Sequence, residues 1–139
     1  MRFYGKIYKD GNFWLAEVPI LEAMTQGRTR KEALVMVADR LETLAHRPGF
    51  AVKVHPGQHG DFEVISTDTR GMISLLLRRQ RERSGLSLAE AAERLGAKSR
   101  NAYARYERGT SVPTLEKLNE LLHAVAPDQD FVLHHSVVA

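Results

Sequence analysis

Side chains that can bond to the edges of nucleic-acid bases recur between residues 99 and 108. Arginine can donate two hydrogen bonds to guanine, and asparagine can exchange two with adenine. Arg100, Asn101 and Arg105 therefore have the chemistry to read base edges. On a helix, positions i, i+1, i+4, i+5 and i+8 lie along one stripe. This spacing predicts one DNA-facing stripe, made of Arg100, Asn101, Ala104, Arg105 and Arg108.

Two serines stand where predicted helices begin. Ser87 precedes a helix over 88–95 and has Glu90 three residues later, the pattern of a capping box. Ser99 precedes a helix over 100–108. The free N–H groups at such helix starts can hold phosphate. We expect Ser87 and Ser99 to contact the DNA backbone, with Arg108 and Arg83 adding phosphate contacts.

Glu107 needs a different role, because a carboxylate beside DNA is unfavourable. It lies close to the end of the helix that carries the predicted stripe. We expect Glu107 to pair with Arg81 of the predicted helix over 72–84 and so brace the stripe-bearing helix. Gly109 then serves as the helix stop.

The elements that must position these residues are helices over 72–84, 88–95, 100–108 and 114–124. Gly96 sits in the short turn between the second and third of them, which predicts a helix-turn-helix. Residues 70–108 hold ten Lys and Arg against four acids, whereas residues 1–66 hold nine against eight. Such clustering of positive charge is typical of a surface that meets a polyanion.

The first half predicts a small antiparallel sheet and one helix. Strands are expected over 2–8, 12–18, 23–26, 50–54 and 62–65, with a helix capped by Thr29 and Glu32 between the third and fourth. The fold class is α+β: a sheet packed on one helix (residues 1–66), a polar linker (67–71), and an all-α helix-turn-helix domain with a C-terminal tail (72–139).

The first two strands meet at Asp10-Gly11, which predicts a hairpin with a type I′ turn. Apolar residues alternate onto both faces of the second strand, so one face can pack on the helix and the other on a partner. The aromatic residues available for a partner are Tyr4, Tyr8, Phe13 and Trp14.

Composition excludes several classes of protein and site. The chain has no cysteine, so it forms no disulfide or thiolate metal site, and we expect a reducing cytoplasm. No apolar run is long enough for a bilayer, and no membrane role is expected. The histidine pairs His55/His59 and His134/His135 lack a completing acid, so no metal and no cofactor are predicted.

The run LSLAEAAERLGAKSRNAYARYERGTSVPTLEKL resembles the Xre/Cro-type helix-turn-helix. Its YARYERG and PTLEKL segments, together with DGNFWLAEVPILEAMTQGRTRKEAL near the start, are similar to HicB-type antitoxins that carry such a domain. Leu88 stands where Xre-type domains usually have Gln, and Ile20, Glu22 and Ala23 replace the family's usual Asp and Pro-Gly.

The resemblance implies a partial ribonuclease-H-like fold without catalytic activity. It further implies an antitoxin that occludes a HicA-type RNA-cleaving toxin and represses the operon that both share. Operator DNA and the toxin are then the partners. A homodimer or higher even oligomer is expected, because one recognition helix reads only a few base pairs.

Two alternatives remain open. The chain could be a stand-alone helix-turn-helix regulator whose N-terminal domain senses a small ligand. A metal-dependent nuclease would need converging carboxylates, and nothing in the spacing of Asp10, Glu17, Asp39 and Glu42 brings them together. We therefore expect no catalytic residue and no enzyme.

Overall fold

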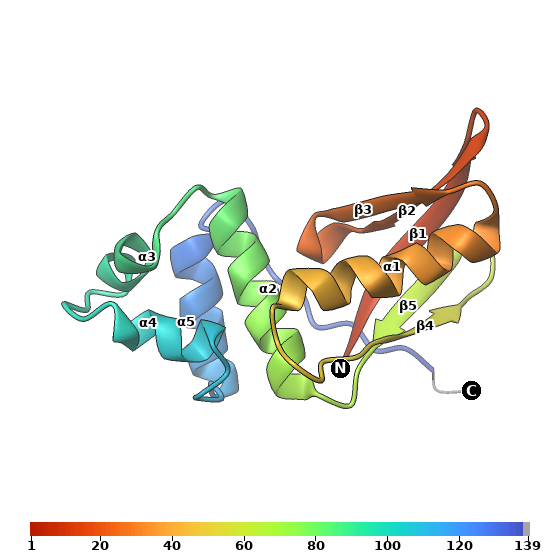
Figure 1. Cartoon of the computed structure of the whole chain (residues 1–139). Helices are drawn as coiled ribbons and strands as arrows, with labels where there is room; N and C mark the ends of the chain where they lie inside the picture. Colours follow the sequence, from red (N-terminus) through yellow and green to blue (C-terminus); the bar gives the residue numbers. More distant parts are fainter. Residues whose placement is uncertain (138–139) are drawn as a thin grey trace.

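The structure, a computed structural model, describes residues 1–137 of the chain. A sheet unit with one covering helix is followed by a unit of four helices (Figure 1). The elements are β1 (Arg2–Asp10), β2 (Phe13–Val18), a short 3₁₀ helix η1 (Pro19–Leu21), β3 (Ala23–Gly27), α1 (Arg30–Ala45), β4 (Lys53–Pro56), β5 (Asp61–Ile65), α2 (Thr69–Arg83), α3 (Leu88–Arg94), α4 (Asn101–Glu107) and α5 (Leu115–Val125). The predicted α+β class is confirmed.

The sheet has five strands in the order β3-β2-β1-β5-β4, and every neighbouring pair is antiparallel. Helix α1 begins after Thr29, whose Oγ1 accepts a hydrogen bond from the Glu32 amide at 3.0 Å. Ala33, Val37 and Leu41, spaced four residues apart, are the buried residues of α1 and face the sheet. The opposite face of the sheet is therefore free of helices in this unit (Figure 1).

The β1–β2 hairpin is present, but its turn differs from the predicted type. Asp10 pairs with Phe13, so the two turn residues are Gly11 and Asn12. Only Gly11 has a positive φ (60°), which fits a type II′ turn and not the type I′ turn expected around Asp10-Gly11.

Of the predicted linker over 67–71, residues 69–71 belong to helix α2, and only residues 67 and 68 precede it. Asp68 caps α2 through a hydrogen bond from the Gly71 amide to its Oδ1 (2.8 Å), so the helix already begins at Thr69. Ser66 Oγ donates to the Ala51 carbonyl and accepts from the Asp68 amide, which fixes the approach to α2. Asp68, one of the polar residues that suggested a linker, is instead the N-cap residue of α2.

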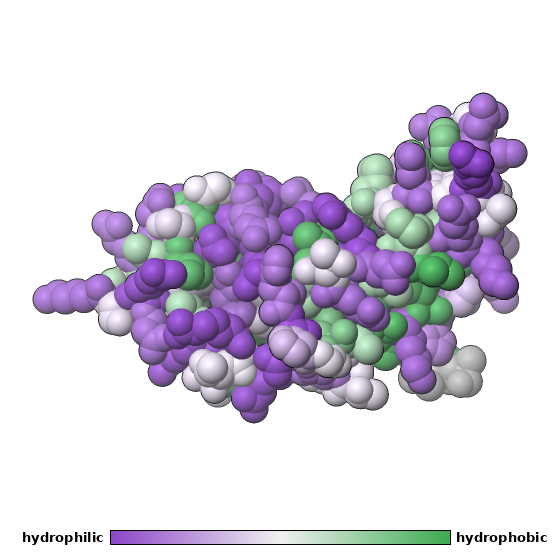
Figure 2. Space-filling view, in the orientation of Figure 1, coloured by the Kyte–Doolittle hydropathy of each residue, from purple (hydrophilic) through white to green (hydrophobic). Residues whose placement is uncertain are grey.

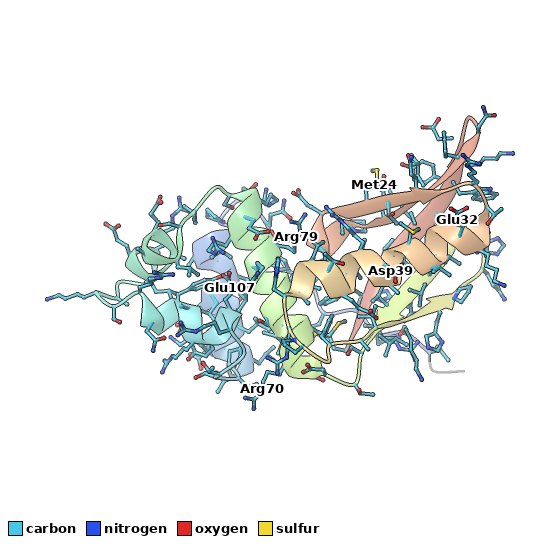
Figure 3. All side chains as sticks on the ribbon, viewed as in Figure 1. Met24, Glu32, Asp39, Arg70, Arg79 and Glu107 are labelled. Carbon is cyan, nitrogen blue, oxygen red and sulfur yellow. The ribbon has the colours of Figure 1, made fainter. Side chains whose placement is uncertain are left out.

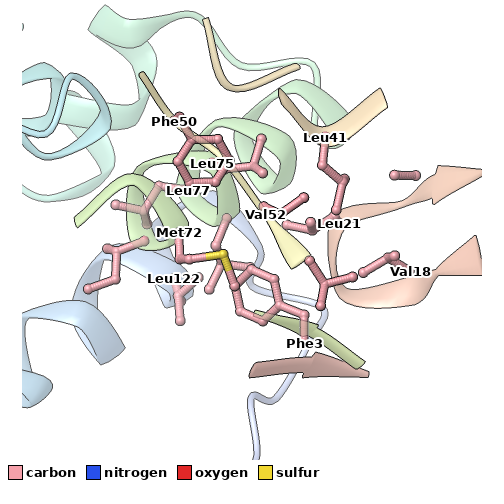
Figure 4. Close-up of a cluster of buried hydrophobic side chains, with 14 of the residues drawn as sticks. Phe3, Val18, Leu21, Leu41, Phe50, Val52, Met72, Leu75, Leu77 and Leu122 are labelled. Atoms are coloured by element: carbon pink, nitrogen blue, oxygen red, sulfur yellow. The ribbon is translucent and has the colours of Figure 1, made fainter. Parts of the chain in front are cut away.

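Helix α2 joins the two units through one continuous core. Every residue from Gly71 to Leu77 is buried, because α2 contacts η1 and α1 on one side and α4 and α5 on the other. Figure 4 shows Met72, Leu75 and Leu77 among side chains of the sheet unit and of α5. Near its C-terminal end α2 is hydrogen-bonded to η1, since Gln80 Nε2 donates to the Ile20 carbonyl at 2.7 Å.

The tail after α5 has no regular secondary structure over residues 131–137, and residues 138 and 139 lie outside the described part. Phe131 packs against the core, and Ser136 Oγ hydrogen-bonds Glu63 of β5. Among residues 1–137 no helix has the length and hydropathy needed to cross a membrane. Figure 2 shows a mostly hydrophilic surface over the helical unit and gathered hydrophobic residues over α1 and its neighbouring strands.

Candidate nucleic-acid interface

Helices α3 and α4 are joined by a tight turn at Gly96. Ser87 caps α3 in a reciprocal capping box: its Oγ accepts from the Glu90 amide (3.1 Å), and its own amide donates to Glu90 Oε1 (3.3 Å). Gly96, at φ 75°, ends α3 as its amide donates to the Glu93 carbonyl. The geometry is that of a helix-turn-helix in which α4 is the second, recognition helix.

Four polar residues of the predicted stripe are exposed at α4: Arg100, Asn101, Arg105 and Arg108. The prediction for Ala104, the fifth residue of the stripe, is wrong. Its side chain is only 1% exposed and cannot contact DNA. The stripe pattern placed it with Arg100 and Arg108, but α4 is held on both flanks by α2 and α3, which leaves a narrower exposed face.

The exposed side chains are partly engaged with each other. Arg108 Nη2 donates to Asn101 Oδ1 across two helical turns. The Arg105 guanidinium lies over the Tyr106 ring, 4.8 Å from its centroid, and donates to the Tyr106 hydroxyl at 3.1 Å. A base that bonds to Asn101 would therefore have to displace Arg108 from the Asn101 amide. Arg105, by contrast, is already oriented by its contact with the Tyr106 ring.

Ser87 and Ser99 are both exposed at helix starts. Ser99 lies one residue further from its helix than predicted, because α4 begins at Asn101 with Arg100 as the N-cap residue. Its Oγ still accepts from the Asn101 amide at 3.3 Å. The phosphate contacts expected of both serines stay predictions.

Helix α4 is anchored by its inner face. Tyr103 is fully buried and donates from its hydroxyl to the Leu77 carbonyl of α2 at 3.3 Å. Burial raises the pKa of the Tyr103 phenol far above its ordinary value, so the group stays a neutral donor. Tyr106 is also buried, as its position three residues later predicts.

The expected pair between Arg81 and Glu107 is present and has two bonds. Arg81 Nε lies 2.8 Å from Glu107 Oε2, and Arg81 Nη2 lies 2.6 Å from Oε1. Glu107 is 4% exposed, and its hydrogen bonds raise the pKa of Arg81. The sequence analysis missed Arg78, whose Nε approaches Glu107 Oε1 to 3.7 Å from one helical turn earlier on α2.

Arg83, for which a phosphate contact was expected, pairs with a carboxylate of this chain. Its guanidinium forms a two-bond ion pair with Asp128 after α5, at 2.6 and 3.1 Å. The side chain therefore connects the end of α2 to the segment after α5, and the phosphate contact expected of Arg83 stays a prediction.

The aromatic residues expected to meet a partner divide between the two faces of the sheet. Tyr4 (54% exposed), Tyr8 and Phe13 (41% exposed) lie on the face opposite α1. Their hydroxyls are held by carboxylates, Tyr4 by Asp61 at 2.9 Å and Tyr8 by Glu17 at 2.6 Å. Trp14 has the opposite parity, together with buried Ala16, and packs against the core.

The histidines and acids of the described residues form no cluster with the arrangement of metal ligands. Within residues 1–137 no three His, Asp or Glu side chains come together in a way that could hold a metal ion. The rings of His134 and His135 stack on the irregular tail, with centroids 5.8 Å apart.

Comparison with known families agrees with the geometry of the helical unit. Residues 73–131 match the model of a family described as a helix-turn-helix domain. No curated protein matches the chain. The part of the chain from α2 through α5 to Phe131 is therefore similar to a helix-turn-helix domain in both sequence and arrangement of helices.

Proposed function

We propose that the chain is the antitoxin of a type II toxin-antitoxin pair. It binds and occludes a HicA-type RNA-cleaving toxin through its sheet unit, and it represses its own operon through α4. It acts by covering the toxin and catalyses no reaction itself. It works in the same cellular compartment as the operon. The observation that carries the DNA-binding half is the exposed row of Arg100, Asn101 and Arg105 on a helix that α2 holds rigidly.

A triple alanine variant tests the DNA-binding half. Each bidentate base contact gives about 1–3 kcal/mol of discrimination. Replacing Arg100, Asn101 and Arg105 together should lower the preference for operator over scrambled duplex by at least about a hundredfold. The operator is sought in the DNA preceding the gene and in duplexes selected from a random pool, and the preference is measured by gel shift.

The matched control removes two guanidinium groups and one side-chain amide from the sheet unit. The exposed residues used for it are Arg28, Arg40 and Gln26. Alanine at these three positions should leave operator preference within about twofold of the parent, since exposed residues away from a contact change little. A triple α4 variant that folds and still selects its operator as well as the parent contradicts the DNA-binding proposal.

The toxin-binding half is supported by the free face of the sheet. Exposed apolar side chains lie there: Tyr4, Tyr8, Phe13 and Met24. Charged residues of both signs share this face, since Glu17 pairs with Lys6 and Glu63 pairs with Arg2. Clustered aromatic residues surrounded by charge are typical of a protein interface.

Co-expression with the adjacent gene, followed by pull-down, tests this half. Replacing Tyr4 and Phe13 with alanine should weaken capture by at least about tenfold, because truncated aromatic anchors typically cost more than 1 kcal/mol each. Val35 and Met36 of α1 are similarly exposed apolar residues on the other layer, and their double alanine variant is the control. Equal capture by both variants contradicts the assignment of this sheet face.

A second candidate function rests on a groove between α1 and the edge strand β4. The groove has a volume of about 600 Å³ and is lined by Leu34, Val35, Ala38, Val54 and Pro56, with Arg30, Lys31 and Asp39 at its rim. A regulator that senses a small ligand would use such a pocket. It is favoured if no neighbouring gene product is captured and a metabolite both raises the melting temperature and changes operator affinity.

A further inference from the structure

The carboxyl end of the recognition helix is contacted by an arginine of the sheet unit. Arg47 lies just after α1, and its Nη1 donates to the Arg108 carbonyl at 3.4 Å. Arg108 is the C-cap residue of α4, so its carbonyl is one of those that a helix leaves without an intrahelical partner. The two residues are 61 positions apart in sequence, and no local pattern predicts their contact.

A tight turn fixes the backbone of Arg47. The Phe50 amide donates to the Arg47 carbonyl at 3.1 Å, and Gly49 between them has φ 78°. Proline followed by glycine is the favoured pair at the centre of a type II turn, and Pro48-Gly49 is such a pair. Phe50 is buried, and a Cβ at Gly71 of α2 would lie only 2.5 Å from its ring. The turn is therefore packed against α2.

A carboxylate at the start of α2 directs the Arg47 side chain. Asp68 Oδ2 accepts from Arg47 Nε at 2.9 Å, while Asp68 Oδ1 accepts from the Gly71 amide at 2.8 Å. One oxygen caps α2 and the other holds the guanidinium, so Arg47 keeps a fixed position relative to α2. The Arg47 and Asp68 side chains are 29% and 30% exposed, and such a pair adds little to the free energy of unfolding.

Arg70 lies in the first turn of α2 (Figure 3) and contacts the next carbonyl along the chain. Its Nη1 donates to the Gly109 carbonyl at 3.1 Å. The approach is close, since a Cβ at Gly109 would lie 2.5 Å from Arg47 Nη1 and 3.4 Å from Arg70 Cγ. Two cations thus stabilise the end of α4, where the helix dipole places partial negative charge.

The segment that Arg47 and Arg70 contact is linked to Arg105, a residue of the exposed row on α4. The Thr110 amide and hydroxyl both donate to the Arg105 carbonyl, at 2.9 and 3.0 Å. Movement of residues 108–110 would therefore displace Arg105 as well. Binding groups work only when they are held within about half an ångström of their productive position. The contacts made by Arg47 consequently affect how well α4 can read bases.

We propose that Arg47 is a positioning residue of the recognition helix. Through it the sheet unit fixes the carboxyl end of α4 and contributes to operator preference without touching DNA. This inference rests on the proposed DNA-binding function and deepens it, because base reading then depends on a residue that precedes the helical unit.

The test compares full-length Arg47→Ala with the parent in two measurements. Hydrogen exchange of the amides of residues 108–111 should become faster, because local opening increases where anchoring contacts are lost. Preference for operator over scrambled duplex should fall about three- to tenfold, the range that one net hydrogen bond supplies. The slope of log affinity against log salt should not change, since no phosphate contact is lost.

Arg79→Ala is the matched control. Arg79 also joins the sheet unit to α2, but near the other end of that helix (Figure 3), where it donates to the Leu21 and Glu22 carbonyls at 2.8 and 2.9 Å. Its loss should lower the melting temperature at least as much as Arg47→Ala, yet leave exchange at residues 108–111 and operator preference unchanged.

Two further variants at position 47 complete the design. Arg47→Lys keeps the charge beside Asp68 and a donor for the Arg108 carbonyl, so it should retain operator preference within about threefold of the parent. Arg47→Met keeps the apolar stem of the side chain, and it replaces the alanine variant in both measurements if thermal melting shows that Arg47→Ala does not fold.

The outcomes separate this inference from the function on which it rests. Unchanged exchange at residues 108–111 in the folded variant overturns the positioning role, and so does faster exchange with unchanged operator preference. A salt slope lowered by about 0.9 also overturns it, because Arg47 would then contact a phosphate. If the parent binds no duplex, the proposed function itself fails, and hydrogen exchange alone decides whether Arg47 positions α4.

Discussion

Glu107 shows how one buried carboxylate can serve a DNA-binding surface without touching DNA. It accepts two hydrogen bonds from Arg81 and approaches Arg78, and both arginines belong to α2. The backbone at the same residue is tied to α2 as well, because Ser74 Oγ donates to the Glu107 carbonyl. The end of the recognition helix is therefore fastened through side chain and main chain together.

Replacing Glu107 with alanine should lower the free energy of unfolding by about 3 kcal/mol, since Arg81 would remain inside without its partner. The melting temperature should fall by ~10 °C. Thermal melting by circular dichroism measures the effect. Glu93→Ala, at an exposed carboxylate of α3, is the control and should change stability by less than about 0.5 kcal/mol.

A double variant lacking both Arg81 and Glu107 separates the ion pair from general damage. The double variant should be more stable than Glu107→Ala alone, because the stranded charge is gone. An unchanged melting temperature in Glu107→Ala would contradict the bracing role.

At the scale of elements, α2 decides how the molecule is organised. A helix at the surface of a domain buries one stripe, whereas α2 buries seven consecutive residues and so is surrounded. Its arginines reach both ways: Arg79 donates to the Leu21 and Glu22 carbonyls of the sheet unit, and Arg81 holds Glu107 of α4. The sheet unit and the helical unit consequently share one core.

We expect the chain to unfold in a single transition, and Met72→Ala should shift that transition without splitting it. Met72 is fully buried in the shared core, so truncation should cost about 2–5 kcal/mol. Fluorescence of Trp14, the one tryptophan, reports on the sheet unit, and far-ultraviolet circular dichroism reports mainly on the helices. Two separated midpoints in the parent would show that the units fold independently.

At the scale of the whole molecule, one copy presents one recognition helix. A helix of seven residues, with four exposed polar side chains counted over the helix and its two cap residues, can contact only a few base pairs. Useful selectivity therefore needs a second copy on a second half-site. The predicted homodimer or higher even oligomer follows from this count of contacts and remains a prediction.

Sedimentation at micromolar concentration should give at least a dimer, and the operator should contain two half-sites about one helical turn apart. Inserting about half a turn of DNA between the half-sites should abolish tight binding, and inserting about a full turn should restore part of it. A monomer that binds a single half-site tightly would contradict the prediction.

Much of the fold and of the candidate interface was predictable, because the signals are local. Capping at Thr29 and Ser87, glycine at Gly96 and Gly109, and alternation along the strands depend on residues within a few positions of each other. The pair of Arg81 and Glu107 was also predictable from the sequence, since a carboxylate on a basic helix is expected to pair with a nearby cation.

What the tertiary structure alone decided depends on neighbours distant in sequence. Ala104 is covered because α2 and α3 flank α4, Arg83 pairs with Asp128 because the chain returns beside it, and Asp68 is held by Arg47 from the sheet unit. Arg47 and Arg70 reach the end of α4 only once α2 has joined both units. Periodicity specifies which residues share a face of an element, but packing between elements determines which of those faces meets solvent.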